Sequence, residues 1–135
     1  MGNSNSLEKP RFVVLYHEMP AGDDRPSHWD LMLEVDCRLE TWALEYKPVA
    51  GKKIVAQKLT SHRINYLTYE GLVSNRRGSV TRVMEGHFAG DGPADSSQHE
   101  FQIVLFESGG TKMLVNFVQE NDQAWHIDFI DPSIA

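Results

Sequence analysis

Three residues in the N-terminal quarter of the chain have the types and the spacing of a metal site. His28 and Asp30 lie two positions apart in residues 28–35 (HWDLMLEV), which alternate in polarity like a β-strand. Side chains two apart on a strand share a face, with their Cα atoms roughly 6–7 Å apart. His17 ends the preceding predicted strand and becomes a third ligand if the two strands pair. Two imidazoles and a carboxylate with open positions suit Mn²⁺, Zn²⁺ or Fe²⁺, although a solvent-facing polar strand has the same spacing.

A second pair, His62 and Tyr66, could act on a phosphate. The two residues stand four positions apart, which places them on one side of a helical turn or on one face of an extended segment. A histidine beside a tyrosine can position a phosphate, transfer a proton, or do both. A surface histidine beside a half-buried tyrosine gives the same spacing, so both interpretations stay open.

The strand with the His-x-Asp pair is expected to separate a core face from a polar face. The predicted core face holds Trp29, Leu31, Leu33 and Val35. The opposite face holds His28, Asp30, Met32 and Glu34. Trp42 and Trp125 are predicted to lie in the core as well.

Many short strands must position these residues. Strand-like composition marks residues 11–17, 28–35, 38–44, 54–59, 78–84, 86–89, 100–106, 112–118 and 125–130. Residues 60–61 are predicted to cap a short helical turn over 62–69, residues 18–27 and 90–97 are predicted loops, and the last three strands form a meander. We expect a flexible N-terminal tail over residues 1–10 and a single domain over 11–135. Turns every ten residues or so indicate a mostly β fold, either a barrel or a sandwich.

Composition narrows the class of protein. The 135 residues are 41% hydrophobic and 24% charged, values typical of globular proteins. No apolar run approaches the ~20 residues needed to span a bilayer, and the N-terminus lacks the apolar segment of a secretory signal, so no membrane association is expected. The one cysteine, Cys37, excludes an internal disulfide and suits a cytoplasmic location. Its acidic neighbours argue against a catalytic thiol.

Charge is distributed unevenly along the chain. The net charge is −6, which by itself does not suggest nucleic-acid binding. Residues 47–82, however, contain eight basic residues and one acidic residue, a charge of +7, and the rest of the chain has a charge of −13. A positive face on an acidic body can bind a polyanion, although a solvated basic surface has the same composition.

Several of these motifs, in this order, resemble the 3′-phosphoesterase module of bacterial DNA ligase D. The motifs are Arg11–His17 (RFVVLYH), His28–Glu34 (HWDLMLE), Thr41–Ala43 (TWA), Ser61–Tyr66 (SHRINY), Tyr69–Gly71 (YEG) and Trp125–Ile127 (WHI). They cover about residues 11–130, and ordered agreement of several motifs is more specific than any single one.

The resemblance implies a compact antiparallel β-barrel with one or two short helices. It also implies an Mn²⁺-dependent enzyme that removes a 3′-terminal ribonucleoside and then the 3′-phosphate from nucleic-acid ends during DNA end repair. Zn²⁺ or another transition metal is an alternative cofactor. By motif, His17, His28 and Asp30 resemble the metal ligands, while His62 and Tyr66 resemble the residues that engage the scissile phosphate.

The chain departs from the family at the residues that hold the phosphate. Met32 stands where the family has an arginine, and methionine cannot donate a hydrogen bond. Lys53 lies one residue from the position of a second family arginine, and a one-residue shift on a strand reverses the face. Arg63, Lys58 and Arg25, the last in the long loop after His17, are the other candidates for substrate binding.

These departures leave alternatives open. The chain could be a catalytically weak or inactive module that binds DNA ends or a partner, or a phosphoesterase for another small substrate. Because no ligase or polymerase motif was found, such a partner is expected to act in trans.

Overall fold

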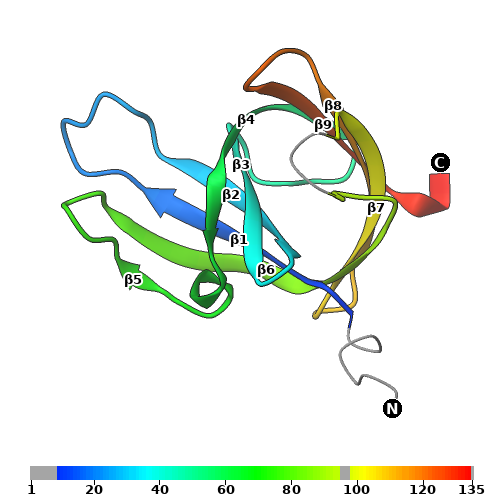
Figure 1. Ribbon diagram of the computed structural model, residues 1–135, viewed down its shortest axis with the longest axis horizontal. Helices are drawn as coiled ribbons and strands as arrows, with labels where there is room; N and C mark the ends of the chain where they lie inside the picture. The colour runs from blue at the N-terminus through cyan, green and yellow to red at the C-terminus, as the bar shows by residue number, and fades with distance from the viewer. Residues whose placement is uncertain (1–8, 95–97, 135) are drawn as a thin grey trace.

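The computed structural model describes residues 9–94 and 98–134 and shows a closed antiparallel β-barrel (Figure 1). The strands are β1 (Arg11–Glu18), β2 (His28–Val35), β3 (Arg38–Leu44), β4 (Lys52–Arg63), β5 (Gly71–Leu72), β6 (Ser79–Gly90), β7 (Glu100–Glu107), β8 (Lys112–Gln119) and β9 (Ala124–Ile130). The helices among these described residues are two single 3₁₀ turns, η2 (Ile64–Leu67) and η3 (Pro132–Ile134). Residues 1–8 of the predicted tail and residues 95–97 of a predicted loop lie outside the described residues.

Eight of the strands form the barrel wall, in the order β1-β2-β3-β4-β9-β8-β7-β6. The barrel closes because β1 pairs with β2 on one side and with β6 on the other. The short β5 pairs with β6 outside this circuit. The expected barrel and the C-terminal meander are therefore confirmed.

The barrel interior is filled by apolar side chains from alternate positions of the strands. Leu31 and Leu33 are fully buried there, as predicted, and Trp42 and Trp125 pack edge-to-face with ring centroids 5.5 Å apart. Trp29 and Val35 are only partly buried. No helix in the described part of the chain is long and apolar enough to cross a bilayer.

A second hydrophobic cluster lies on the outer side of the β1–β2 wall. It contains Val13, Leu15, Met32, Leu39, Leu67 and Val80. Leu67 comes from η2, so the segment after β4 folds back over the outer face of the barrel. Both faces of β2 are therefore buried at its centre. The interpretation of the second face as solvent-facing was wrong for Asp30 and Met32.

Two predicted element boundaries were also wrong. β4 continues to Arg63, because Leu39 and Arg38 of β3 pair with His62 and Arg63, and the helical turn is limited to η2. The two strands predicted over residues 78–89 are one strand, β6, in which Gly86 lies where a Cβ would be 2.0 Å from the carbonyl oxygen of Phe106. That glycine permits a close approach between strands and does not make a turn.

Candidate metal centre

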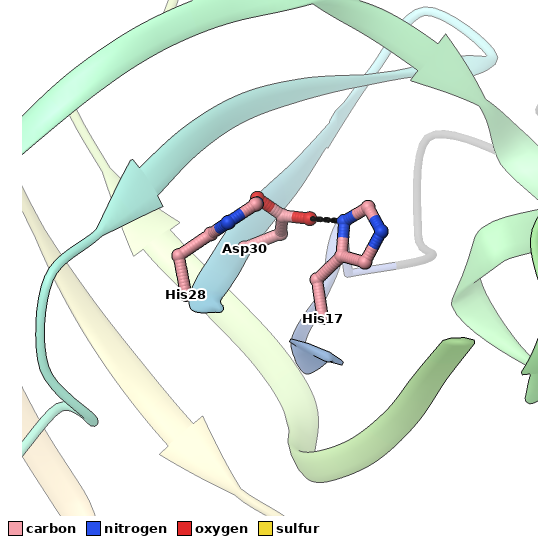
Figure 2. A group of neighbouring side chains, drawn as sticks. All are labelled: His17, His28 and Asp30. Carbon is pink, nitrogen blue, oxygen red and sulfur yellow. Dashed lines mark ion pairs between the residues drawn. The ribbon is translucent and has the colours of Figure 1, made fainter. Parts of the chain in front are cut away.

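Strand pairing brings three potential ligands together on the outer face of the barrel. His17 in β1 lies opposite His28 in β2, and Asp30 lies opposite Leu15. His17 Nδ1 is 3.5 Å from Asp30 Oδ2, and His28 Nε2 is 3.1 Å from Asp30 Oδ1 (Figure 2). One ligand atom from each residue lies within 4.8 Å of the other two. The predicted convergence of the two imidazoles and the carboxylate is thus confirmed.

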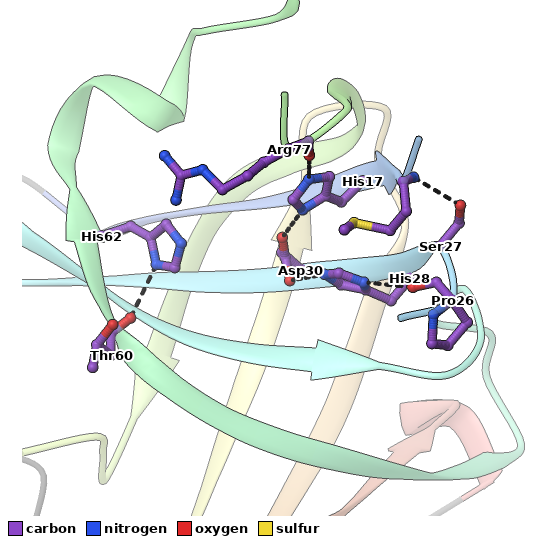
Figure 3. Close-up of polar contacts among 9 residues, drawn as sticks. His17, Pro26, Ser27, His28, Asp30, Thr60, His62 and Arg77 are labelled. Atoms are coloured by element: carbon purple, nitrogen blue, oxygen red, sulfur yellow. Dashed lines mark hydrogen bonds and ion pairs between the residues drawn. The ribbon is translucent and has the colours of Figure 1, made fainter. Parts of the chain in front are cut away.

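Backbone carbonyls fix the tautomer of both imidazoles. His17 Nε2–H donates to the carbonyl oxygen of Arg77 at 2.6 Å, and His28 Nδ1–H donates to that of Pro26 at 3.1 Å (Figure 3). In the neutral imidazole the other nitrogen then has a lone pair. These lone pairs, on His17 Nδ1 and His28 Nε2, are on the atoms that face Asp30. Such an arrangement is typical of histidines that bind a metal.

Two local features hold these carbonyls in position. The backbone N–H of Met19 donates to the hydroxyl of Ser27 at 2.9 Å, which ties together the ends of the loop between the two histidines. Gly78 follows Arg77 at φ +86°, and a Cβ there would lie 1.9 Å from the carbonyl oxygen of Glu18. Only glycine fits this approach, so Gly78 determines where the Arg77 carbonyl meets His17.

The carboxylate of Asp30 is buried and needs a nearby positive charge. The residue is 2% exposed, and Oδ1 has no hydrogen-bond partner among the described residues. Burial alone would raise the pKa of Asp30, but its interactions with His17 and His28 outweigh burial and lower it. Burial would likewise lower the pKa of His28, yet Asp30 more than offsets this and raises it. A buried carboxylate of this kind requires a positive charge beside it, either a proton on His28 or a metal ion.

His62 and Tyr66 lie beside the triad because the end of β4 and η2 fold over the outer wall. His62 shares the outer face with Leu39, its partner in β3, and Figure 3 shows its ring turned toward His17 and Asp30. Tyr66 packs edge-on against that ring with centroids 5.7 Å apart.

The environment of His62 favours its neutral form. Burial is the largest effect and lowers the pKa of His62, although the nearby charge of Asp30 opposes it. Its Nδ1–H donates to the carbonyl oxygen of Thr60 at 3.0 Å, so Nε2 has the lone pair. A neutral imidazole with a free Nε2 can accept a proton.

The four basic residues predicted to bind substrate are dispersed. Lys58 lies close enough to His62 for its charge to lower the pKa of that imidazole, but its ammonium is paired with Glu40 at 3.1 Å. Arg25 lies close enough to His28 for its charge to lower the pKa of that imidazole. Gln57 is the β4 residue in the same cross-strand row as Asp30. Lys53 lies four residues before Gln57, opposite Asp128, and is therefore not beside the triad. Arg63 is exposed, and alternation along β4 puts its side chain on the opposite face from His62. Of the four, Arg25 is thus the one that the fold brings to His28 of the triad.

The family arginine position is occupied by a buried apolar group. Met32 is 1% exposed and belongs to the second hydrophobic cluster. Arg82 of β6, which was not among the predicted substrate-binding residues, has its guanidinium on the same outer face. Leu15 of β1 lies between the two residues, since it pairs with Arg82 on one side and with Asp30 on the other. Its Nη1 donates to the carbonyl oxygen of Leu67 and lies 3.7 Å from Glu85 Oε1.

Fold and site together define a closed antiparallel barrel with a His-His-Asp cluster on its outer wall. Residues 20–120 match the family described as the DNA Ligase D 3'-phosphoesterase domain, and the chain belongs to this family. His28, Asp30, His62 and Tyr66 lie within the matched residues, and His17 lies three residues before them. No curated protein matches the sequence.

Proposed function

We propose that this protein is a metal-dependent phosphoesterase that acts on the 3′ ends of nucleic acid. The single observation that supports the proposal best is the His17, His28 and Asp30 cluster, in which both imidazole lone pairs and a buried carboxylate converge. Two nitrogens and a carboxylate can bind Mn²⁺ or Zn²⁺. We propose Mn²⁺ as the native ion because of the family, and Zn²⁺ as the alternative.

The chain's own residues divide the chemistry between them. A divalent ion in the triad would supply Lewis-acid polarisation of a phosphoryl oxygen. His62 accepts a proton from the attacking water through Nε2, because its pKa is lowered and its Nδ1 is occupied by Thr60. As the water oxygen bonds to phosphorus, the P–O3′ bond breaks, and the leaving 3′ oxygen takes a proton from solvent. The hydroxyl of Tyr66 donates to the phosphate, and Arg25 beside His28 balances its negative charge.

The test is hydrolysis of a DNA primer–template that ends in a 3′-phosphate, with Mn²⁺ and with EDTA. Wild-type protein is expected to release inorganic phosphate only with the metal, and His28→Ala is expected to lose this activity. His87→Ala is the matched control, because His87 is an exposed histidine at the opposite end of the barrel, opposite Arg11. Equal activity in wild type and His28→Ala would refute the proposal. Generic phosphomonoesters and a 3′-ribonucleoside end in the same assay distinguish a small-substrate enzyme from an end-repair enzyme.

One observation favours a second candidate function, a module that binds nucleic-acid ends without turnover. Met32 offers no donor where the family has an arginine, and it is sealed inside the second hydrophobic cluster. This candidate predicts Mn²⁺ binding and DNA binding with no phosphate release, so metal-dependent hydrolysis by the wild type eliminates it. If the protein is an enzyme, a ligase or polymerase acting in trans, in the cytoplasm, would use the 3′-OH that it leaves.

A further inference from the structure

A groove adjoins the metal triad along the outer wall of the barrel. It has a volume of about 740 Å³, and His28 is part of its lining. Arg25 lines it on the side of the 18–27 loop, Tyr46 on the side of the β3–β4 connection, and Gln123 on the side of the β8–β9 hairpin. The size is within the range of pockets that hold small organic ligands.

The register of four strands places the groove beside Asp30. Asp30 of β2 lies opposite Ala43 of β3, Ala43 lies opposite Gln57 of β4, and Gln57 lies opposite Ala124 of β9. All four residues are on the outer face. The small side chains of the two alanines leave a depression between their larger neighbours. Because strands are spaced about 4.8 Å apart, Gln57 lies roughly 10 Å from Asp30 along this row.

The rim of the groove offers an aromatic ring and amide groups. Tyr46 is 58% exposed, and the ammonium of Lys52 lies 5.3 Å from the centre of its ring. Gln57 Nε2 donates to Gln123 Oε1 at 3.4 Å, a long bond that a better partner can replace. Within residues 45–53, Glu45 and Tyr46 line the groove, and Lys52 reaches its edge through the Tyr46 ring.

We infer that this groove binds the 3′-terminal nucleotide of a single strand while its 3′-phosphate lies at the triad. The inference rests on the proposed function and names the part of the substrate that is recognised. The base stacks on Tyr46, since stacking on an exposed aromatic is how proteins bind single strands without regard to sequence. The amides of Gln57 and Gln123 face the base edge, and Arg25 in the lining and Lys52 beside Tyr46 attract the backbone.

The experiment measures binding and turnover separately. Binding is measured by fluorescence anisotropy of a 5′-labelled single-stranded oligonucleotide with a 3′-phosphate, in metal-free buffer. Tyr46→Ala is expected to raise Kd about tenfold, which is the usual effect of losing one stacked base. Val55→Glu, which adds a carboxylate on the exposed groove wall, is expected to raise Kd, and Val55→Lys is expected to lower it.

Phe106→Ala is the matched control for Tyr46→Ala. Phe106 is 41% exposed with the ammonium of Lys112 5.8 Å from its ring centre, and it lies at the opposite end of the barrel. In turnover, the ratio of kcat/KM for the oligonucleotide to that for a small phosphomonoester falls about tenfold in Tyr46→Ala and stays at the wild-type value in Phe106→Ala.

The outcomes separate this inference from the proposed function. Tyr46-dependent binding by a protein that hydrolyses nothing supports the groove and refutes the enzymatic proposal. Hydrolysis by the wild type, with Kd and the kcat/KM ratio unchanged in both Tyr46→Ala and Val55→Glu, overturns the groove and leaves the enzyme. No binding and no hydrolysis by the wild type overturns both.

Discussion

Replacing Gly78 with alanine should weaken the metal centre without changing any of its proposed ligands. Gly78 has φ +86°, and a Cβ there would lie 1.9 Å from the carbonyl oxygen of Glu18 and 3.2 Å from Cα of Met19. These are backbone atoms, so no side-chain rotation can relieve the overlap. The backbone on both sides must separate, and the 2.6 Å hydrogen bond from His17 to the Arg77 carbonyl is then lost or lengthened.

The magnitude follows from two contributions. An alanine at positive φ costs about 1–2 kcal/mol in the free energy of unfolding. Overlap in a packed region adds about 1–3 kcal/mol. Loss of the carbonyl that orients a ligating histidine typically lowers metal affinity about 10–100-fold.

Gly22→Ala is the control that separates the two contributions. Gly22 has nearly the same φ, +84°, but a Cβ there meets nothing within 4 Å. Urea unfolding followed by tryptophan fluorescence gives the free energy of each variant, and isothermal titration with Mn²⁺ gives the affinity. Gly78→Ala should lose about 1–3 kcal/mol more than Gly22→Ala and should alone lose metal affinity. Equal losses of stability and unchanged affinity in both variants would refute the reasoning.

Further predictions concern the neighbours of the triad. His62→Gln should lower kcat for phosphate release about 10²–10⁴-fold with Mn²⁺ affinity retained, as measured by titration calorimetry. Met32→Arg should lower the free energy of unfolding in urea by about 3–5 kcal/mol, because it buries an unpaired charge. Mn²⁺ affinity should increase with pH through a step above 6.5, because the pKa of His28 is raised and the metal must displace its proton. The bidentate hydrogen bonds from Arg11 lower the pKa of Glu34 in the folded protein. Glu34→Gln should therefore lower the free energy of unfolding by about 1 kcal/mol above pH 4.5, the ordinary pKa of a glutamate. This difference should disappear as the pH falls through the lower pKa of Glu34 in the folded protein.

Each of these predictions has an outcome that would contradict it. Full activity in His62→Gln removes the proton acceptor from the proposal. A Met32→Arg protein as stable as the wild type shows that the second hydrophobic cluster opens easily. A pH-independent Mn²⁺ affinity excludes His28 as a ligand. A stability difference for Glu34→Gln that persists unchanged at pH 2 means that the carboxylate charge is not the cause.

The sequence was sufficient for the elements defined by local pattern. The bounds of β2 and β3 were predicted to the residue, because polarity alternates in 28–35 and the stretch 38–44 has strong strand formers. The pairing of His17 with His28 also followed, since the two predicted strands were adjacent and joined by one loop.

Long-range contacts explain what local pattern could not predict. β4 extends beyond residue 59 because β3 provides partners for it, and this pairing overrides the capping signal at residues 60–61. Asp30 and Met32 looked like members of a solvent-facing strand face. Met32 is buried because η2, more than thirty residues later, covers that face with Leu67, and Asp30 is buried between His17 and His28.

In the candidate site, too, the sequence indicated local features and missed those set by long-range contacts. The metal-ligating types and their spacing were evident in the sequence, but the backbone carbonyls of Arg77 and Pro26 have no sequence signature of their own. The glycine after Arg77 was the available signal, and it was interpreted only as the start of a strand. Lys53 was selected by alignment, and the register of β4 places it some distance along the strand from the triad.

The central claim is that His17, His28 and Asp30 bind one metal ion. The most direct measurement is the anomalous difference density of crystals grown with Mn²⁺, collected on the high-energy side of the manganese absorption edge. We predict one strong peak between His17 Nδ1, His28 Nε2 and the carboxylate of Asp30, absent from Asp30→Asn crystals. A manganese peak elsewhere on the protein, or none at saturating Mn²⁺ with the three side chains ordered, would contradict the claim.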